Sequence, residues 1–125
     1  MVTLKIEVTG LKECINFLNL KKKEIEERAD KQIKDSANFL KEEVKASIEG
    51  HRSEPRSVDT GEFLNSVEVV NQGDGEVAIE SDVPQADYME YGTSNINARR
   101  HFGATIDRET DKITNDMQTE INKVS

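Results

Sequence analysis

Several features that mark large protein classes are missing from this sequence. The chain of 125 residues contains a single cysteine, Cys14, so no disulfide can form within it and nothing points to an oxidising compartment. It contains no apolar run near the roughly 20 residues that a membrane-spanning helix needs. Its first residues also lack the basic and apolar regions of a signal peptide. We therefore expect a soluble protein that is made in the cytoplasm and has no membrane partner.

Basic residues are missing from a long central stretch of the chain. No Lys or Arg lies between Arg56 and Arg99, although this stretch carries nine carboxylates, and the whole chain has a formal net charge of −8. Nucleic acids attract proteins through clustered Lys and Arg side chains. The central stretch would instead repel a polyanion, which argues against sequence-specific DNA binding.

Motifs of catalytic chemistry are missing as well. The two histidines, His51 and His101, lie far apart and neither has the spacing of a metal site, and no phosphate-binding glycine loop or paired Cys-His set is present. The triplet Asp59-Thr60-Gly61 matches the active site of aspartic proteases. There, however, apolar strands hold two carboxylates close enough to share a proton, whereas here a polar loop precedes the triplet and a helical pattern follows it. We expect no enzyme, no cofactor and no metal.

The composition predicts one small domain with much polar surface. Apolar residues make up 34% of the chain and charged residues another 34%, and the mean hydropathy is −0.70. Such a chain has a thin core for its length. We therefore expect contacts between subunits to supply part of its stability.

The first half of the chain shows two hydrophobic periods. Apolar and polar residues alternate from Val2 to Val8, which predicts a half-buried strand over residues 2–9. A helical period then begins and is interrupted once, at a cluster of lysines. It predicts a short helix over about 11–19 and a long helix over about 22–49.

The second half predicts a hairpin and two further helices. Two β-like runs, 66–71 and 76–83, are joined by a glycine-rich turn, which is a hairpin signal. With the first strand they form a small, mostly antiparallel sheet packed against the long helix, and the class is α+β with a C-terminal helix. The predicted elements are a polar loop at 50–58, a hairpin at 66–83, a short helix at 86–91, a loop at 92–99 and a helix at 104–124, all in a single domain over residues 1–125.

The length of the long helix suggests an assembly. Its predicted 22–49 span covers about 42 Å, whereas a compact domain of this size is not much above about 35 Å across. One end should therefore extend past the domain, where another copy of the chain would cover its apolar stripe. The alternative is a helix that bends or frays at Gly50. The stripe that we expect to share with a neighbouring copy contains Ala29, Ile33, Leu40 and Val44.

Two motif segments and a third short run resemble a known family. The segments are Asp59 to Ser66, Tyr88 to Thr93 and Asn97 to Phe102. In this order they resemble the neck and tail-completion proteins of long-tailed bacteriophages, whose usual pattern is D-T-G-x-L-x-x-S, then Y-x-x-Y-x-E-[FY]-G-T, then A-R-P-F. The sequence departs from the last motif, because Arg100-His101-Phe102 stands where the family has arginine, proline and phenylalanine. The residues that correspond to the motifs are Asp59, Thr60, Gly61, Ser66, Tyr88, Glu90, Tyr91, Gly92, Thr93, Phe102, and Arg99 or Arg100 for the family arginine.

The resemblance implies a structural role in a virion. Such proteins form rings, of six or twelve copies, in the neck that joins the phage head to the tail. The implied partners are other copies of the chain, a head-closure or connector protein, and a tail-terminator or tail-tube protein. DNA would pass through the ring without specific binding. The protein would be located in the virion neck, after assembly in the host cytoplasm.

The acidic stretch has one interpretation within a ring and another outside it. Copies arranged around a channel could present carboxylates toward the passing DNA, although screening limits this effect to about 8 Å at physiological salt. The alternative is a solvated acidic face that keeps the protein soluble. A competing function is a small acidic interaction module or an inhibitor that mimics a nucleic-acid backbone. The candidate channel or inter-ring carboxylates are Glu68, Asp74, Glu76, Glu80 and Asp82.

Two motif positions carry specific structural expectations. Gly92 follows the Tyr88 to Tyr91 turn immediately before a polar loop, so we expect a positive φ angle there. Arg99 and Arg100 are the first basic residues after the central stretch. Because the arginine fork suits bidentate pairing with a carboxylate, we expect these two residues to contact carboxylates of another subunit.

Overall fold

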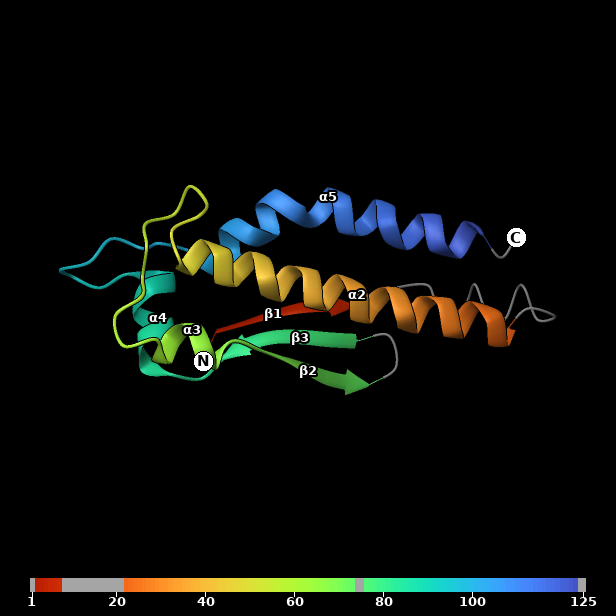
Figure 1. Ribbon diagram of the computed structural model, residues 1–125, viewed down its shortest axis with the longest axis horizontal. Coiled ribbons are helices and arrows are strands. Elements are labelled where there is room, and N and C mark those ends of the chain that lie inside the picture. The colour runs from red at the N-terminus through yellow and green to blue at the C-terminus, as the bar shows by residue number, and fades with distance from the viewer. Residues whose placement is uncertain (1, 8–21, 74–75, 124–125) are drawn as a thin grey trace.

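The computed structural model describes residues 2–7, 22–73 and 76–123 of the chain (Figure 1). The predicted helix over 11–19 and the carboxylate of Asp74 lie outside the described residues. The architecture is a small antiparallel sheet with long helices on one side, which confirms the predicted α+β class. In chain order the elements are β1 (Val2–Glu7), α2 (Lys22–Ile48), α3 (Glu62–Ser66), β2 (Glu68–Gly73), β3 (Glu76–Ser81), α4 (Pro84–Tyr91) and α5 (His101–Asn122).

The sheet has the strand order β1-β3-β2, and both pairings are antiparallel. Ile79 at the centre of β3 lies opposite Leu4 of β1 and Val69 of β2. Because side chains alternate across a strand, these three share the face that packs on the helices. The predicted alternation in the first strand is thus confirmed for the described residues. β2 begins at Glu68, two residues later than predicted, since the preceding residues up to Ser66 form the helix α3.

The two long helices lie side by side over that face of the sheet (Figure 1). α2 runs toward the end of the molecule where α3 and α4 lie, and α5 returns along it in the opposite direction. An ion pair between Arg28 Nη1 and Glu120 Oε2, 3.4 Å apart, links the beginning of α2 to the end of α5. The core between the layers contains Val2, Leu4, Ile33, Ala37, Leu40, Val44, Ile48, Phe63, Val67, Val77, Ile79, Ala86, Phe102 and Met117.

The apolar stripe of α2 is covered by the chain itself, so its predicted role as a subunit interface is wrong. Ala29 and Val44 are 0% exposed, Ile33 is 3% and Leu40 is 4%. The expectation assumed a round domain, from which a long helix would project. The domain is instead elongated, because α5, with its 22 residues, extends alongside α2. A neighbouring copy would have to use other surfaces.

Two of the predicted helix boundaries moved for local reasons. α2 ends at Ile48, and Gly50 then takes a φ angle of 87°, which reverses the chain. α4 begins at Pro84 rather than at residue 86, because proline fits the first turn of a helix, where its missing N–H is not needed. No helix in the described part of the chain is both long and apolar enough to cross a membrane.

Candidate functional site

The three motif segments meet at one end of the molecule. α3, α4, the loop 92–99 and the first turn of α5 all lie at this end (Figure 1). The ring of Phe63 from the first motif lies 5.9 Å from the ring of His101, measured between centroids. The fold thus assembles residues that are about 40 positions apart in the sequence.

Glu90 points inward and caps the last helix. Its side chain is 6% exposed, and its two oxygens accept hydrogen bonds from the backbone N–H groups of Phe102 (2.8 Å) and Gly103 (2.9 Å). These N–H groups have no partner inside the helix, and a negative charge is favoured at a helix N-terminus. The cap fixes the start of α5 at His101, so the predicted start at residue 104 is wrong. The helix begins earlier than predicted because its cap comes from a side chain of the preceding helix, and no pattern in the neighbouring sequence indicates such a cap.

We expect Glu90→Gln to lower the free energy of unfolding by about 1 to 2 kcal/mol, because the amide would turn a donor toward one of the two N–H groups and would remove the charge. Urea denaturation of the purified protein measures this loss. The matched control is Glu42→Gln on the exposed side of α2, which should change stability by less than about 0.5 kcal/mol. Equal stabilities of the two variants would contradict the capping role.

Arg99 is bound within its own chain. Its backbone N–H donates to the carbonyl of Met89 at 2.6 Å. Its guanidinium Nη1 donates to the carbonyl of Arg56 at 2.7 Å and to Ser57 Oγ at 3.0 Å. These contacts tie the start of α5 to α4 and to the loop 50–58. The side chain therefore contacts a carbonyl and a hydroxyl, not a carboxylate.

Arg100 faces solvent and occupies an unusual backbone conformation. Its φ angle is 49°, a region that a residue with a side chain rarely adopts. Its Nη2 lies 3.3 Å from the Asp107 carboxylate, and both side chains are more than half exposed. Such exposed pairs contribute little to stability. Of the two arginines, Arg100 is the one with an accessible guanidinium.

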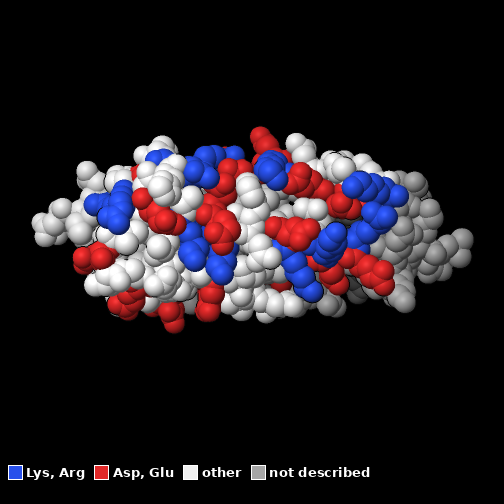
Figure 2. All heavy atoms as spheres, viewed as in Figure 1, with Lys and Arg blue, Asp and Glu red and all other residues white. Residues whose placement is uncertain are grey.

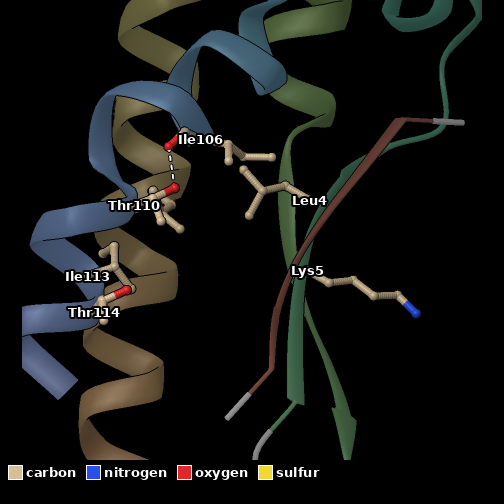
Figure 3. A pocket seen from close by; sticks show the side chains of 7 residues that line it. Leu4, Lys5, Ile106, Thr110, Ile113 and Thr114 are labelled. Carbon is tan, nitrogen blue, oxygen red and sulfur yellow. Dashed lines mark hydrogen bonds between the residues drawn. The ribbon is translucent and has the colours of Figure 1, made fainter. Parts of the chain in front are cut away.

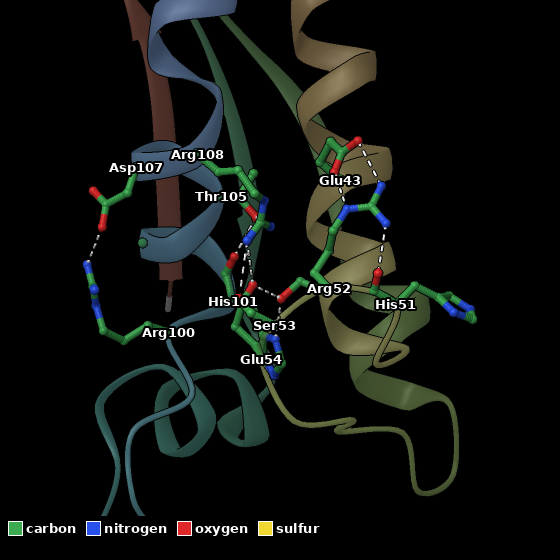
Figure 4. A network of polar contacts seen from close by, with 12 residues as sticks. Glu43, His51, Arg52, Ser53, Glu54, Arg100, His101, Thr105, Asp107 and Arg108 are labelled. Carbon is green, nitrogen blue, oxygen red and sulfur yellow. Dashed lines mark hydrogen bonds and ion pairs between the residues drawn. The ribbon is translucent and has the colours of Figure 1, made fainter.

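A buried chain of hydrogen bonds runs through the imidazole of His101, which is 0% exposed (Figure 4). Ser47 Oγ lies 2.7 Å from Nδ1 and Ser57 Oγ lies 2.7 Å from Nε2. Ser47 donates its only hydrogen to Glu54 Oε1 at 2.6 Å, so it must accept from the ring, which places the imidazole proton on Nδ1. Nε2 is then the acceptor from Ser57.

An anion and a cation close the other side of this network. Both oxygens of Glu54 accept from Arg108 Nη1 at 3.2 Å, and Ser53 Oγ also donates to this carboxylate. Burial raises the pKa of Glu54, but the hydrogen bonds from Ser47, Ser53 and Arg108 and the charge of Arg108 outweigh it, so the pKa lies below the usual value. The carboxylate stays charged.

The same surroundings keep His101 neutral. Its pKa is lowered from 6.5 to about 4, mainly by burial; the charge of Glu54 opposes this shift and the charge of Arg99 adds to it. The order serine, histidine, serine, glutamate is reminiscent of a catalytic relay. However, His101 is 0% and Ser57 5% exposed, so no substrate can reach them. The network joins α2, the loop 50–58 and α5. No spacing rule links its members, and sequence reasoning missed all of them.

The first motif forms a turn and a link to the sheet. Gly61 takes a φ angle of 87° and occupies the N-cap of α3, whereas no side chain caps this helix. Asp59 is exposed, and Thr60 Oγ1 accepts from the N–H of Glu62 at 3.3 Å. At the other end of α3, the hydroxyls of Ser66 and Ser81 lie 2.5 Å apart. The motif thus positions α3 against β3.

The second motif supports a loop that projects from the end of the molecule (Figure 1). Gly92 takes a φ angle of 76°, which confirms the expected positive value. Within the loop, the N–H of Thr93 donates to the carbonyl of Ile96 at 2.8 Å, and Thr93 Oγ1 accepts from the N–H groups of Asn95 and Ile96. The loop therefore has a defined conformation of its own.

Three apolar side chains on this end face solvent. Tyr88 is 53% exposed, Tyr91 is 71% and Ile96 is 36%. We call this group the tyrosine knob. The two tyrosines belong to α4, and exposed tyrosines on a rigid element are typical anchors of protein interfaces. The second motif therefore combines an inward cap with an outward contact surface.

Of the predicted channel carboxylates, Glu68, Glu76 and Glu80 share the sheet face that is turned away from the helices. Glu68 and Glu80 lie directly opposite each other across β2 and β3. Glu76 is on the same face by its register and lies 3.7 Å from Lys5 Nζ, and Asp82 is exposed just beyond β3. Figure 2 shows that basic and acidic side chains are instead interspersed along α2 and α5. In the described residues, no group of three His, Cys, Asp or Glu side chains is suited to a metal ion.

Like charges directly opposite each other destabilise a sheet by roughly 0.2 to 1 kcal/mol. We therefore expect Glu80→Gln to raise the free energy of unfolding by a few tenths of a kcal/mol, through removal of its repulsion with Glu68. Urea denaturation at low and at high salt measures the effect, which should shrink as salt screens the pair. Glu27→Gln, on an exposed part of α2, is the control and should show no such gain.

Comparison with known proteins gives one match. The family model described as "Bacteriophage HK97-gp10, putative tail-component" is similar to residues 12–92, which is more than half of the chain. The matched part includes α2, the sheet hairpin, the first motif and α4, and it ends at Gly92. No curated protein and no solved structure matches the chain.

Proposed function

Because the chain belongs to the HK97-gp10-like family of bacteriophage tail components, we propose that it forms a homo-oligomeric ring in the neck between the head connector and the tail tube. The family makes it a structural protein of the virion. We propose in addition that the protein forms a ring, that this ring lies in the neck, and that it has no catalytic turnover. The resemblance in the motif segments agrees with the family.

The observation that carries the proposal is that some side chains of the motif segments are buried in contacts within the chain, whereas others are exposed to solvent. Their charged and aromatic members Glu90, Arg99 and Phe102 turn inward and lock the corner between α4 and α5. Tyr88 and Tyr91 remain exposed on that rigid corner. A fixed corner that presents aromatic side chains to solvent is suited to subunit contact.

The acidic sheet face supports a position beside DNA. Glu68 and Glu80 repel each other within the fold, so they do not serve its stability. In the proposed ring this face lines the passage or meets the next ring, and its carboxylates keep the phosphates of passing DNA from binding. The effect requires the face to lie within about 8 Å of the DNA surface at physiological salt.

Loss of the protein tests the function directly. In a phage that carries a nonsense mutation in this gene, we expect DNA-filled heads and free tails that do not join, as seen by electron microscopy. Supply of the wild-type chain from a plasmid should restore tailed, infectious particles. Tailed particles without the protein would contradict the proposal. An acidic inhibitor of a DNA-binding protein would give that result, because its loss leaves particle structure intact.

A further inference from the structure

Besides the tyrosine knob, the molecule has a second apolar surface that its own described residues do not fill. A groove of about 240 Å³ lies between β1 and α5 (Figure 3). We call it the α5 groove. Its walls include Leu4, Leu40, Ile106, Thr110, Ile113 and Thr114.

The walls of the α5 groove are suited to an apolar occupant. Leu4 points across it toward α5, and Ile106 is 41% exposed at its edge (Figure 3). The hydroxyl of Thr110 donates to the carbonyl of Ile106 at 2.5 Å, so its polar group is already satisfied within the helix. An apolar cavity of about 150 Å³ is known to hold a benzene ring. The α5 groove can therefore take the ring of a tyrosine.

The tyrosine knob has the properties of such an occupant. Tyr91 is the most exposed large apolar side chain in the described residues, at 71%. The loop beside it is held by its own hydrogen bonds and by the bond from the N–H of Arg99 to Met89. Little conformational entropy is therefore lost when it binds.

The charges around the two surfaces are complementary. The segment 91–100 contains two arginines and no carboxylate, whereas the segment 106–116 of α5 contains four carboxylates and two basic residues. Both basic residues of α5 are held within the chain, since Arg108 binds Glu54 and Lys112 binds Asp116 at 2.6 Å. Asp107 pairs with Arg100 of the same chain at 3.3 Å, so the rim carboxylates outside these pairs are Glu109 and Asp111. On the side of the knob, Arg99 binds a carbonyl and a hydroxyl, so it is the arginine whose charge can complement this rim.

We propose that the tyrosine knob of one subunit inserts into the α5 groove of the next copy of the same chain. This inference rests on the proposed ring and names its contact surfaces. The knob is at the end of the molecule and the groove is on its flank (Figures 1 and 3), so two copies that join leave one free knob and one free groove. A head-to-tail contact of this kind repeats from copy to copy and closes into a ring when the rotation between neighbouring copies divides a full turn, whereas a contact between identical patches stops at a dimer.

Paired variants test the contact. The knob variant carries Tyr91→Asp and Ile96→Asp, and the groove variant carries Ile106→Asp and Thr114→Asp, all at exposed positions. By light scattering, we expect the wild type to form closed oligomers, each variant alone to be a monomer, and their equal mixture to form a heterodimer, since one intact knob meets one intact groove. The control Asn38→Asp, on an exposed part of α2, should assemble as the wild type does.

The outcomes separate this inference from the proposed ring. If the wild type forms oligomers and both variants do so equally, or if the mixture stays monomeric, the knob and groove are not the contact although the ring stands. If the wild type stays monomeric in solution and in isolated necks, both proposals fail. Either result would leave the groove to another virion protein.

Disulfide formation gives a positional test. In a Cys14→Ser background, chains with Ile96→Cys and chains with Thr110→Cys should form a mixed disulfide dimer under mild oxidation. Chains with Ile96→Cys and chains with Asn38→Cys should not. The proposal would be overturned if these chains form oligomers as the wild type does but the first pair gives no more mixed disulfide dimer than the second pair.

Discussion

Gly92→Val should lower the free energy of unfolding by at least about 2 kcal/mol. The backbone there has a φ angle of 76°, which a β-branched residue rarely adopts. In addition, a Cβ atom at this position would lie 2.7 Å from the N of Ala98 and 2.8 Å from the O of Ile96. Both neighbours are backbone atoms of the projecting loop, so the loop itself would have to move.

Urea denaturation and particle assembly measure this prediction together. Gly61→Val is the matched comparison, because Gly61 has a φ angle of 87° but its Cβ would meet only the side chain of Asn65, at 3.5 Å. The Gly61 variant should therefore carry the backbone strain alone and lose less stability than the Gly92 variant. A Gly92 variant as stable as the wild type would show that the loop adapts at no cost, against the defined conformation described above.

Stability should fall on mild acidification because His101 is buried in its neutral form. Its pKa is about 4 in the folded chain and 6.5 when exposed, so the unfolded chain binds the proton more tightly. The contribution is fully present above pH 6.5 and is lost as the pH falls toward 4. Linkage gives a loss of about 2 kcal/mol at pH 5 and about 3 kcal/mol at pH 4.

Two variants isolate the histidine responsible. His101→Gln should be less stable than the wild type at pH 7, yet its free energy of unfolding should change little between pH 7 and pH 5, because the titrating group is gone. His51→Gln should keep the wild-type slope, since His51 is exposed. Because the pKa of Glu54 is lowered in the folded chain, a separate loss of stability begins as the pH falls below the usual carboxyl pKa of 4.5. A wild-type slope in the His101 variant would disprove the assignment.

Elements with a local signal could be predicted from the amino-acid sequence. The alternation from Val2 predicted β1, and the helical stripe with Gly50 at its end predicted α2 to within one residue. Gly92 was identified by its place after a helical turn, and its positive φ is confirmed. The motif segments identified the phage family that the match over residues 12–92 shows. Backbone periodicity and glycine conformation are properties of neighbouring residues, so a single chain reports them without its fold.

The contacts between these elements, in contrast, depend on the packing of the whole fold. The length of α2 predicts that its apolar stripe forms a subunit interface. In the elongated domain, however, α5 and the sheet cover this stripe. The carboxylate of Glu90 caps a helix twelve residues further on, and His101 is bound between serines from α2 and the loop 50–58. Such partners are chosen by the packing of whole elements, and no spacing in the sequence encodes that choice. Among the described residues, the same packing leaves the tyrosine knob exposed and the α5 groove unfilled.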